Sequence, residues 1–195
     1  YARDNESFGL TTMRGEHVEA EGSRIRFCFR AKSGKLCEID LADRRMARIV
    51  RQCQELRGQE LFAYVDDDGE VRDVRSEDVN RYLAEASGRP FTAKEIRTWG
   101  ASVRAFGTLR EMGPASAVRE RKRNITQTIK EVAAHLGNTP AVCRSSYVHP
   151  VVLGAYEDGL LFSVPLPDEL DDGLGRSEHG LLTLLREADR ETLVA

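Results

Sequence analysis

The sequence predicts a mainly α-helical protein with one small antiparallel β-sheet (α+β). Two observations predict this fold class. Residues 25–30 alternate apolar and basic side chains, as a half-buried strand does, and a Ser-Gly turn separates them from a second short strand. From Thr92 onward, apolar residues instead recur at helical spacing between glycine and proline stop signals.

The strands are expected in the N-terminal half of the chain. Their segments are short, rich in alternating or β-branched residues and bounded by turn residues: an extended piece at 9–13, two or three strands within 16–40, and a possible pairing of 61–65 with 70–74. Ser33-Gly34 is the turn signal of the main hairpin, and Lys32 and Lys35 flank it. A lysine at a hairpin tip can extend away from the sheet.

The helices are predicted from apolar stripes and capping residues. Their expected starts are Asp40 or Asp43, Ser76, Thr92, about residue 117, Thr139 and Ser177. Thr139 offers a hydroxyl to the first turn of its helix, and Pro140 fits the first helical position, where its missing N–H costs nothing. Gly137 is suited to end the preceding helix, and Pro150 discourages continuation of the one that follows.

Charge is distributed unevenly along the 195 residues, which carry a net charge of −3. Residues 156–195 hold ten acidic side chains and three arginines, whereas the rest of the chain carries a net charge of +4. A mildly basic body with an acidic tail is compatible with a DNA partner, although a solvated surface of mixed charge looks the same. We expect a catalytic domain over 1–164 and an acidic linker and helix over 165–195.

Several functional classes find no support in the sequence. No apolar run approaches the ~20 residues that span a bilayer, so no membrane partner is expected. The four cysteines form no Cys-x-x-Cys pair and no Cys/His metal spacing, so no metal site is predicted. Scattered thiols of this kind suit a reducing cytosol.

Four places combine cations, polar donors and a nucleophile. Lys32 lies at the hairpin tip, Arg97 follows Lys94 by three residues on one helix, and Asn138 precedes Tyr147 by nine residues. The chain lacks a Ser/His/Asp arrangement, a phosphate-binding P-loop and paired carboxylates at a plausible site. Hydrogen-bond donors without a metal centre suit a transition state whose negative charge is spread over phosphate oxygens.

Three motifs carry a family resemblance: Phe29-Arg-Ala-Lys-Ser-Gly-Lys35, Phe91-Thr-Ala-Lys-Glu-Ile-Arg-Thr-Trp99, and Gly137-Asn-Thr-Pro through Ser145-Ser-Tyr-Val-His-Pro150. In order and spacing they resemble the type IB DNA topoisomerases, in particular the compact bacterial and poxviral kind, from Tyr1 to about Leu161. They resemble the tyrosine recombinases more distantly. The resemblance implies a topoisomerase IB or tyrosine-recombinase-like catalytic domain that acts on duplex DNA without ATP, metal or another cofactor.

The resemblance also implies a role for each motif residue. Tyr147 would attack a backbone phosphate and become joined to the 3′ phosphate, Arg97 would bind the non-bridging oxygens, and Lys32 would protonate the departing 5′ oxygen. Asn138 stands where many relatives carry histidine, so we assign it a hydrogen-bond donor role without acid or base work. Residues expected to contact DNA are Tyr1, Lys35, Lys94, Arg144 and Ser146. A monomer in the cytoplasm, associated with the nucleoid, is expected.

Members of the family that this chain resembles carry a further catalytic arginine a few residues before the position that matches Tyr1. They also carry an N-terminal domain that covers the other face of the DNA. We expect a polypeptide that begins at Tyr1 to bind DNA weakly and cleave it poorly, and addition of the upstream arginine to restore cleavage. A relaxation assay on both polypeptides tests this expectation.

Other interpretations of these residues stay open from the sequence alone. A tyrosine recombinase would need partner protomers and a specific site, and a helical DNA-binding module would need no nucleophile. Lys35 and Lys94 suit phosphate contacts and plain surface cations equally. The basic cluster at 119–123 is more often a solvated face, and Trp99 is expected in the core.

Overall fold

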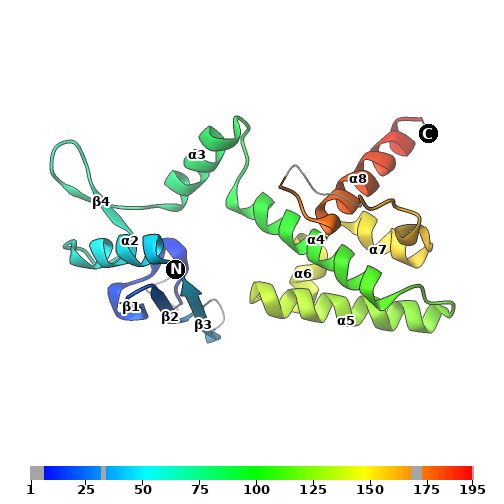
Figure 1. Cartoon of the computed structure of the whole chain (residues 1–195), viewed down its shortest axis with the longest axis horizontal. Helices are drawn as coiled ribbons and strands as arrows, with labels where there is room; N and C mark the ends of the chain where they lie inside the picture. The colour runs from blue at the N-terminus through cyan, green and yellow to red at the C-terminus, as the bar shows by residue number, and fades with distance from the viewer. Residues whose placement is uncertain (1–6, 32–33, 168–172, 195) are drawn as a thin grey trace. The chain divides into compact units, whose positions relative to one another are not determined.

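The computed structural model describes residues 7–31, 34–167 and 173–194, and the chain divides into two compact units. Unit 1 covers residues 1–92 and unit 2 covers residues 93–195. Unit 1 contains the strands, whereas the described part of unit 2 is built from helices (Figure 1). The predicted fold class, mainly α with a small antiparallel sheet, is confirmed.

The sheet of unit 1 has three antiparallel strands in the order of the chain: β1 (Val18–Glu21), β2 (Arg24–Arg30) and β3 (Leu36–Ala42). Side chains of β2 alternate between exposed and buried along its whole length, which confirms the predicted half-buried strand. Ile25 of β2 lies opposite Leu41 of β3. The turn between these strands includes Gly34, whose φ of 70° is in the left-handed region that glycine adopts without strain.

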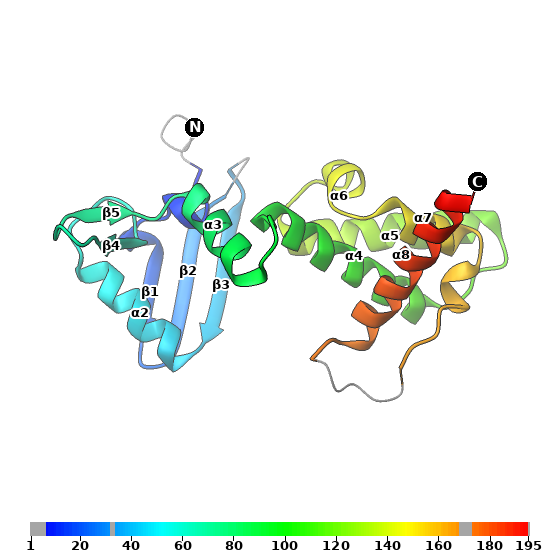
Figure 2. The ribbon, with the colours of Figure 1, turned by 90° about the horizontal axis from the view of Figure 1, so that it is seen from above.

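Helix α2 (Arg44–Glu55) packs against β1 and β2 (Figure 2). It begins at Asp43, because the Asp43 Oδ1 accepts the Met46 N–H at 2.8 Å. Ala47 and Val50 are buried in one cluster with the apolar side chains of β2. The sequence left Asp40 and Asp43 open as the helix start, and this capping bond decides between them.

The prediction of an extended piece at residues 9–13 is wrong. Leu10–Thr12 form a single 3₁₀ turn, η1, and a second turn, η2 (Gly15–His17), leads into β1. The Thr12 N–H donates to the Gly9 carbonyl at 3.2 Å, and the Gly9 N–H donates to the Thr12 hydroxyl at 2.9 Å. These local bonds favour the turn over the extended form that threonine content alone suggests.

A short hairpin and a helix complete unit 1: β4 (Ala63–Val65), β5 (Val71–Asp73) and α3 (Ser76–Ser87). The hairpin confirms the predicted pairing, and its turn is held by Asp66, whose carboxylate accepts the Glu70 N–H at 2.8 Å. Ser76 was expected as the N-cap of α3, but it is the first helical residue. Arg75 occupies the cap position, and its N–H donates to Asp78 at 2.9 Å.

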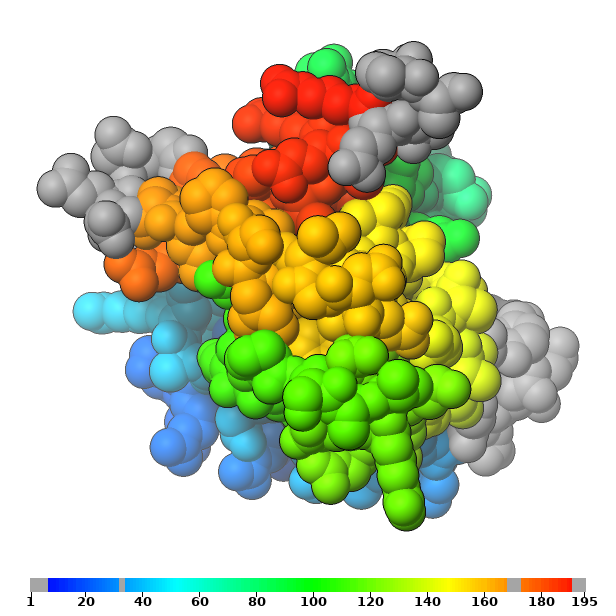
Figure 3. Space-filling model, turned by 90° about the vertical axis from the view of Figure 1, so that its right-hand side faces the viewer, coloured from blue at the N-terminus to red at the C-terminus, as the bar shows by residue number. Residues whose placement is uncertain are grey.

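Unit 2 consists of α4 (Ala93–Met112), α5 (Val118–Leu136), α6 (Pro140–Ser146), α7 (Pro150–Glu157), the 3₁₀ turn η4 (Leu160–Phe162) and α8 (Arg176–Val194). Fully buried side chains from these helices meet in one core: Phe106, Leu109, Ile125, Val132, Val152, Tyr156, Leu161 and Leu181. In Figure 3 the chain after α7 lies between the α4–α5 connection and α8. Within the described ranges, no helix combines the length and the apolarity needed to cross a bilayer.

The boundary between the compact units lies at residues 92 and 93. The expected division into a catalytic domain over 1–164 and an acidic linker and helix over 165–195 stays a prediction. Residues 173–194 belong to unit 2, because Leu181 and Leu184 of α8 are buried in the core formed by α4, α5 and α7. The acidic residues of 173–194 indicate an exposed face, but they do not indicate against which helices Leu181 and Leu184 pack. Helix α8 is therefore an integral part of unit 2.

Candidate active site

Tyr147 lies at the junction of two short helices that each begin with proline. Thr139 caps α6, with its hydroxyl accepting the Val142 N–H at 3.3 Å, and Pro140 takes the first helical position, as predicted. Tyr147 is the C-cap residue of α6, and its N–H donates to Cys143 at 3.0 Å. Pro150 then starts α7. The two proline starts therefore fix a short, non-helical segment that carries the phenol.

The backbone around Tyr147 is held by Ser102 of α4. The Ser102 hydroxyl accepts the His149 N–H at 2.9 Å and lies 3.3 Å from the Tyr147 carbonyl and 2.8 Å from the Thr98 carbonyl, either of which can accept its proton. Ser102 is only 3% exposed. Sequence reasoning missed this residue, although a small polar side chain within the apolar stripe of α4 was a visible signal.

His149 also helps to fix the backbone next to Tyr147. It is the N-cap residue of α7, and its Nδ1 accepts the Val151 N–H at 3.3 Å. Together with the bond from its own N–H to Ser102, this arrangement fixes the backbone two residues after Tyr147. His149 therefore contributes to the placement of the phenol through the backbone.

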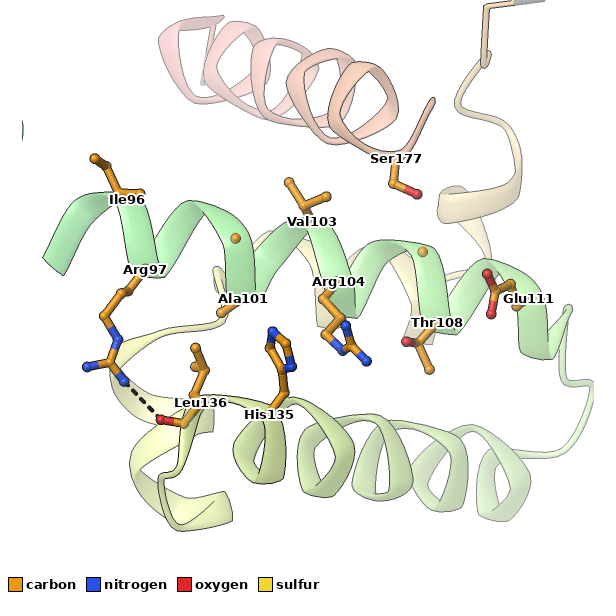
Figure 4. Close-up of a pocket in the computed structure, with 12 residues that line it drawn as sticks. Ile96, Arg97, Ala101, Val103, Arg104, Thr108, Glu111, His135, Leu136 and Ser177 are labelled. Carbon is orange, nitrogen blue, oxygen red and sulfur yellow. Dashed lines mark hydrogen bonds between the residues drawn. The ribbon is translucent and has the colours of Figure 1, made fainter. Parts of the chain in front are cut away.

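Arg97 projects from the second turn of α4 toward the end of α5 and contacts Tyr147. One guanidinium N–H donates to the Leu136 carbonyl at 3.0 Å (Figure 4). The guanidinium carbon lies 5.1 Å from the centroid of the Tyr147 ring, within the range of a cation–π contact. In the described part of the chain, the other guanidinium N–H groups of Arg97 and the Tyr147 hydroxyl form no hydrogen bond, so these groups stay available for a ligand.

Asn138 follows Leu136 by two residues and is the third candidate site residue, after Tyr147 and Arg97. Gly137 ends α5 in the left-handed conformation, as predicted, and the Asn138 N–H returns to the Ala133 carbonyl at 2.9 Å. The Asn138 Nδ2 is buried and has no hydrogen-bond partner among the described residues. A buried donor without a partner costs about 1–3 kcal/mol. Such a group is understandable when a ligand supplies the missing acceptor.

The remaining predicted site residues are only partly placed. Lys94, Arg144 and Ser146 are exposed in unit 2, with Lys94 one turn before Arg97 on α4. Lys35 is exposed in unit 1, beside the hairpin turn. Lys32 and Tyr1 lie outside the described residues, so their predicted roles stay predictions.

An open groove of about 630 Å³ runs along α4, starting at Arg97 (Figure 4). Arg104, Thr108 and Glu111 continue the line of Arg97 along this helix, and His135 of α5 faces them. Tyr147 and Asn138 are not among the described residues that line the groove. Arg97 thus lines the groove and also contacts the ring of Tyr147. Arg104, which lines the groove as well, provides a matched control for Arg97. Among the described residues, no group of three His, Cys, Asp or Glu side chains has the geometry of a metal site.

A sequence model described as "Eukaryotic DNA topoisomerase I, catalytic core" matches residues 1–160. The chain belongs to the type IB DNA topoisomerase family. The resemblance found in the motifs is therefore confirmed, and the tyrosine-recombinase alternative is not favoured. Arg97, Asn138 and Tyr147 all lie within the part that matches the type IB topoisomerase core.

A curated type IB topoisomerase supports the same family. The chain is 30% identical over 171 residues to DNA topoisomerase 1B of Acanthamoeba polyphaga mimivirus. That alignment covers 84% of this chain and 51% of the viral enzyme, so the chain spans about half the length of this relative. The family-model match ends at residue 160, and helix α8 of this type IB topoisomerase chain lies beyond that residue.

Proposed function

We propose that the chain is the catalytic part of a DNA topoisomerase that relaxes supercoiled duplex DNA through a covalent phosphotyrosine intermediate. The observation that carries the proposal is the contact of Arg97 with the ring of Tyr147. Among the described residues, the remaining N–H groups of this cation and the neighbouring Tyr147 hydroxyl form no hydrogen bond. The Asn138 Nδ2, which also has no partner there, belongs to the residue two positions after the carbonyl that Arg97 binds. A phosphate diester is the anion that these donors and this nucleophile suit together.

The proposed reaction exchanges one phosphodiester for another. The Tyr147 phenol gives up its proton to solvent and its oxygen bonds to the phosphorus of a strand phosphate. The bond to the 5′ oxygen breaks, and the phosphate remains attached to its 3′ side. Arg97 and Asn138 donate hydrogen bonds to the non-bridging oxygens as these gain charge, and Lys32 supplies the proton that the departing 5′ oxygen takes. The broken strand rotates about the intact strand. Its 5′ hydroxyl then attacks the phosphotyrosine and returns its proton to Lys32, while the departing Tyr147 oxygen takes a proton from solvent and becomes a phenol again.

Energy conservation follows from this exchange. The bond between phosphate and Tyr147 retains the free energy of the original phosphodiester, so religation needs neither ATP nor another cofactor. Donation of hydrogen bonds to the developing oxyanion typically contributes about 10²–10³-fold in rate for each donor. Proton donation to a leaving group contributes about 10²–10⁴-fold. Arg97, Asn138 and Lys32 together therefore account for a large acceleration without a metal ion.

Duplex DNA is the proposed partner, and we extend the proposal to a monomer that works on the nucleoid in the cytoplasm. The mildly basic composition of residues 1–155 supports a DNA partner. The exposed side chains of Lys35, Lys94, Arg144 and Ser146 suit contacts with strand phosphates.

The test is denaturant trapping of a covalent adduct. The chain is mixed with duplex DNA that is labelled on the side of the cleaved bond that keeps the 3′ phosphate. The reaction is stopped with detergent, and the protein is digested for peptide mapping. We expect the label on the peptide that contains Tyr147, and we expect Tyr147→Phe to abolish the adduct while DNA binding survives. A tyrosine recombinase would require cognate sites for an adduct, and a non-catalytic binding module would give none. An adduct on another residue, or an undiminished adduct in Tyr147→Phe, would refute the proposal.

A further inference from the structure

Helix α8 lies beyond the residues that match the family core, yet it packs directly on α4, the helix that carries Arg97. Leu181 is fully buried and Leu184 is 6% exposed, and both belong to the same core as Phe106 of α4. The C-terminal helix therefore shares its packing with one element of the candidate active site. This arrangement raises the question of what α8 does for Arg97.

Two glycines allow α8 and α4 to approach closely. A Cβ at Gly180 of α8 would lie 2.5 Å from ring atoms of Phe106 and 2.7 Å from Leu166. A Cβ at Gly107 of α4 would lie 2.9 Å from the Ser177 hydroxyl oxygen. Contacts this short do not occur between unshifted atoms, so a larger residue at Gly180 would displace its neighbours. The position of α8 on α4 is therefore closely specified.

A hydrogen bond joins the start of α8 to the turn of α4 that carries Arg97. The Trp99 indole N–H donates to Glu178 Oε1 at 3.3 Å, and the Gly175 N–H donates to Glu178 Oε2 at 2.7 Å. Trp99 follows Arg97 by two residues and packs against the core of unit 2. One carboxylate thus connects the first turn of α8 with the Arg97 turn, using both of its oxygens.

Helix α4 is consequently fixed near Arg97 by two hydrogen bonds to other helices. On one side, Ser102 binds the backbone of His149, which follows the nucleophile. On another, Glu178 binds Trp99. We propose that Glu178 is a positioning residue, which holds Arg97 in place against Tyr147 through its bond to Trp99. This inference rests on the proposed function, since it gives the C-terminal helix a part in strand cleavage.

The physical reason is the steep dependence of catalysis on geometry. A displacement of about 1 Å in a group that binds the transition state costs up to about 100-fold in rate, even when its cause is remote. An arginine on a helix can be displaced by rotation or fraying of the turn that bears it. The hydrogen bond from the Trp99 indole to the Glu178 carboxylate opposes both motions, and neither residue needs to contact DNA.

Two single variants and one control test the inference in the full chain. Trp99→Phe removes the N–H and keeps an aromatic ring. Glu178→Gln keeps one acceptor oxygen but places an NH₂ group against the N–H donor of either Trp99 or Gly175. Glu187→Gln makes the same charge change at an exposed position of α8 and serves as the control. Trp99 is the only tryptophan of the chain, so its indole N–H gives a single resonance that reports the bond.

Three quantities are measured: the rate constant of adduct formation at saturating duplex, the dissociation constant for duplex, and the hydrogen exchange of amides 94–100. We expect Trp99→Phe and Glu178→Gln each to slow adduct formation by roughly tenfold, below the ~100-fold limit for a 1 Å displacement. Exchange of amides 94–100 should accelerate, whereas the dissociation constant should stay within about twofold. The double variant should be no slower than the slower single variant, because both remove one interaction. Glu187→Gln should match the wild type throughout.

Wild-type exchange at amides 94–100 in both variants would overturn the inference, whatever the cleavage rates are. Accelerated exchange with unchanged adduct formation would also overturn it, because the bond would then be purely structural. Absence of any adduct from the wild-type chain, both alone and with the upstream arginine supplied, is a different result, which would refute the proposed function. In that case the exchange data alone would decide whether Glu178 holds this turn.

Discussion

The guanidinium of Arg97 lies over the ring of Tyr147, 5.1 Å from its centroid, while one of its N–H groups is bound to the last carbonyl of α5. The contact connects two residues that are fifty positions apart in the sequence. It also uses only part of the hydrogen-bonding capacity of Arg97. The arrangement therefore leaves both the cation and the phenol available for one phosphate group.

Replacement of Arg97 should impair cleavage much more than folding. We expect Arg97→Ala to slow adduct formation by roughly 10²–10³-fold, because an oxyanion donor is lost. Arg97→Lys should recover part of this loss, since lysine keeps the charge but lacks the planar fork. Arg104→Ala is the control, because Arg104 is exposed two turns further along α4. Equal losses in Arg97→Ala and Arg104→Ala would contradict a specific role for Arg97.

Asn138 should show opposite effects on stability and on cleavage. Asn138→Ala removes a buried Nδ2 that has no partner in the described structure, so we expect the free energy of unfolding to stay equal or to rise by up to about 1–3 kcal/mol. Cleavage should slow, because the same donor is expected to bind the phosphate. Urea denaturation and adduct kinetics on one preparation check both signs. A strongly destabilised Asn138→Ala variant would indicate a structural role for the amide.

Ser102 should matter for both stability and cleavage. Ser102→Ala leaves the partly buried His149 N–H without its acceptor, and we expect a loss of about 1–3 kcal/mol in the free energy of unfolding. Adduct formation should also slow, because the Tyr147 segment loses its connection to α4. Ser145→Ala removes a hydroxyl from an exposed position of α6 and should change neither quantity. Thermal melting and single-turnover kinetics give the comparison.

The two glycines of α4 and α8 with contrasting surroundings should respond oppositely to alanine. Gly180→Ala forces a Cβ to within 2.5 Å of Phe106, and we expect a destabilisation of about 1–3 kcal/mol from overpacking. Gly100→Ala meets nothing within 4 Å in the described structure and should stabilise α4 by about 0.5–1 kcal/mol. Chemical denaturation measures both. Equal stability of the two variants would show that α8 does not pack on α4 as described.

The β4–β5 hairpin should lose stability in acid through Asp66. Hydrogen bonding to Arg72, and then to the backbone of Glu70, lowers the pKa of Asp66 below the ordinary 3.8. The stabilisation from this carboxylate is therefore complete above 3.8 and is lost as the pH falls through the lowered pKa. Asp66→Asn should destabilise unit 1 at neutral pH, and its difference from the wild type should vanish in strong acid. A difference that persists in acid would exclude the ionised carboxylate as the cause.

Much of the fold could be predicted from local signals. The alternation in β2, the caps at Asp43 and Thr139, the glycine after α5 and the prolines of α6 and α7 act within a few residues of their own positions. The 3₁₀ turn at Leu10–Thr12 was missed because the prediction rested on β-branched content, which does not reveal the hydrogen bonds between Gly9 and Thr12. A helix near Ser177 was predicted, but the residues against which α8 packs were not, because they lie far away in the chain.

The sequence alone determined the chemical groups of this protein and their family: a tyrosine, an arginine and an asparagine in three spaced motifs, set on helices whose ends it also marked. The tertiary structure decided which groups meet. Ser102 finds His149 across 47 residues, and Trp99 finds Glu178 across 79. Such pairs leave no periodic trace in a single sequence, because a hydrogen bond between distant segments depends on how the helices pack and not on the spacing of the residues along the chain.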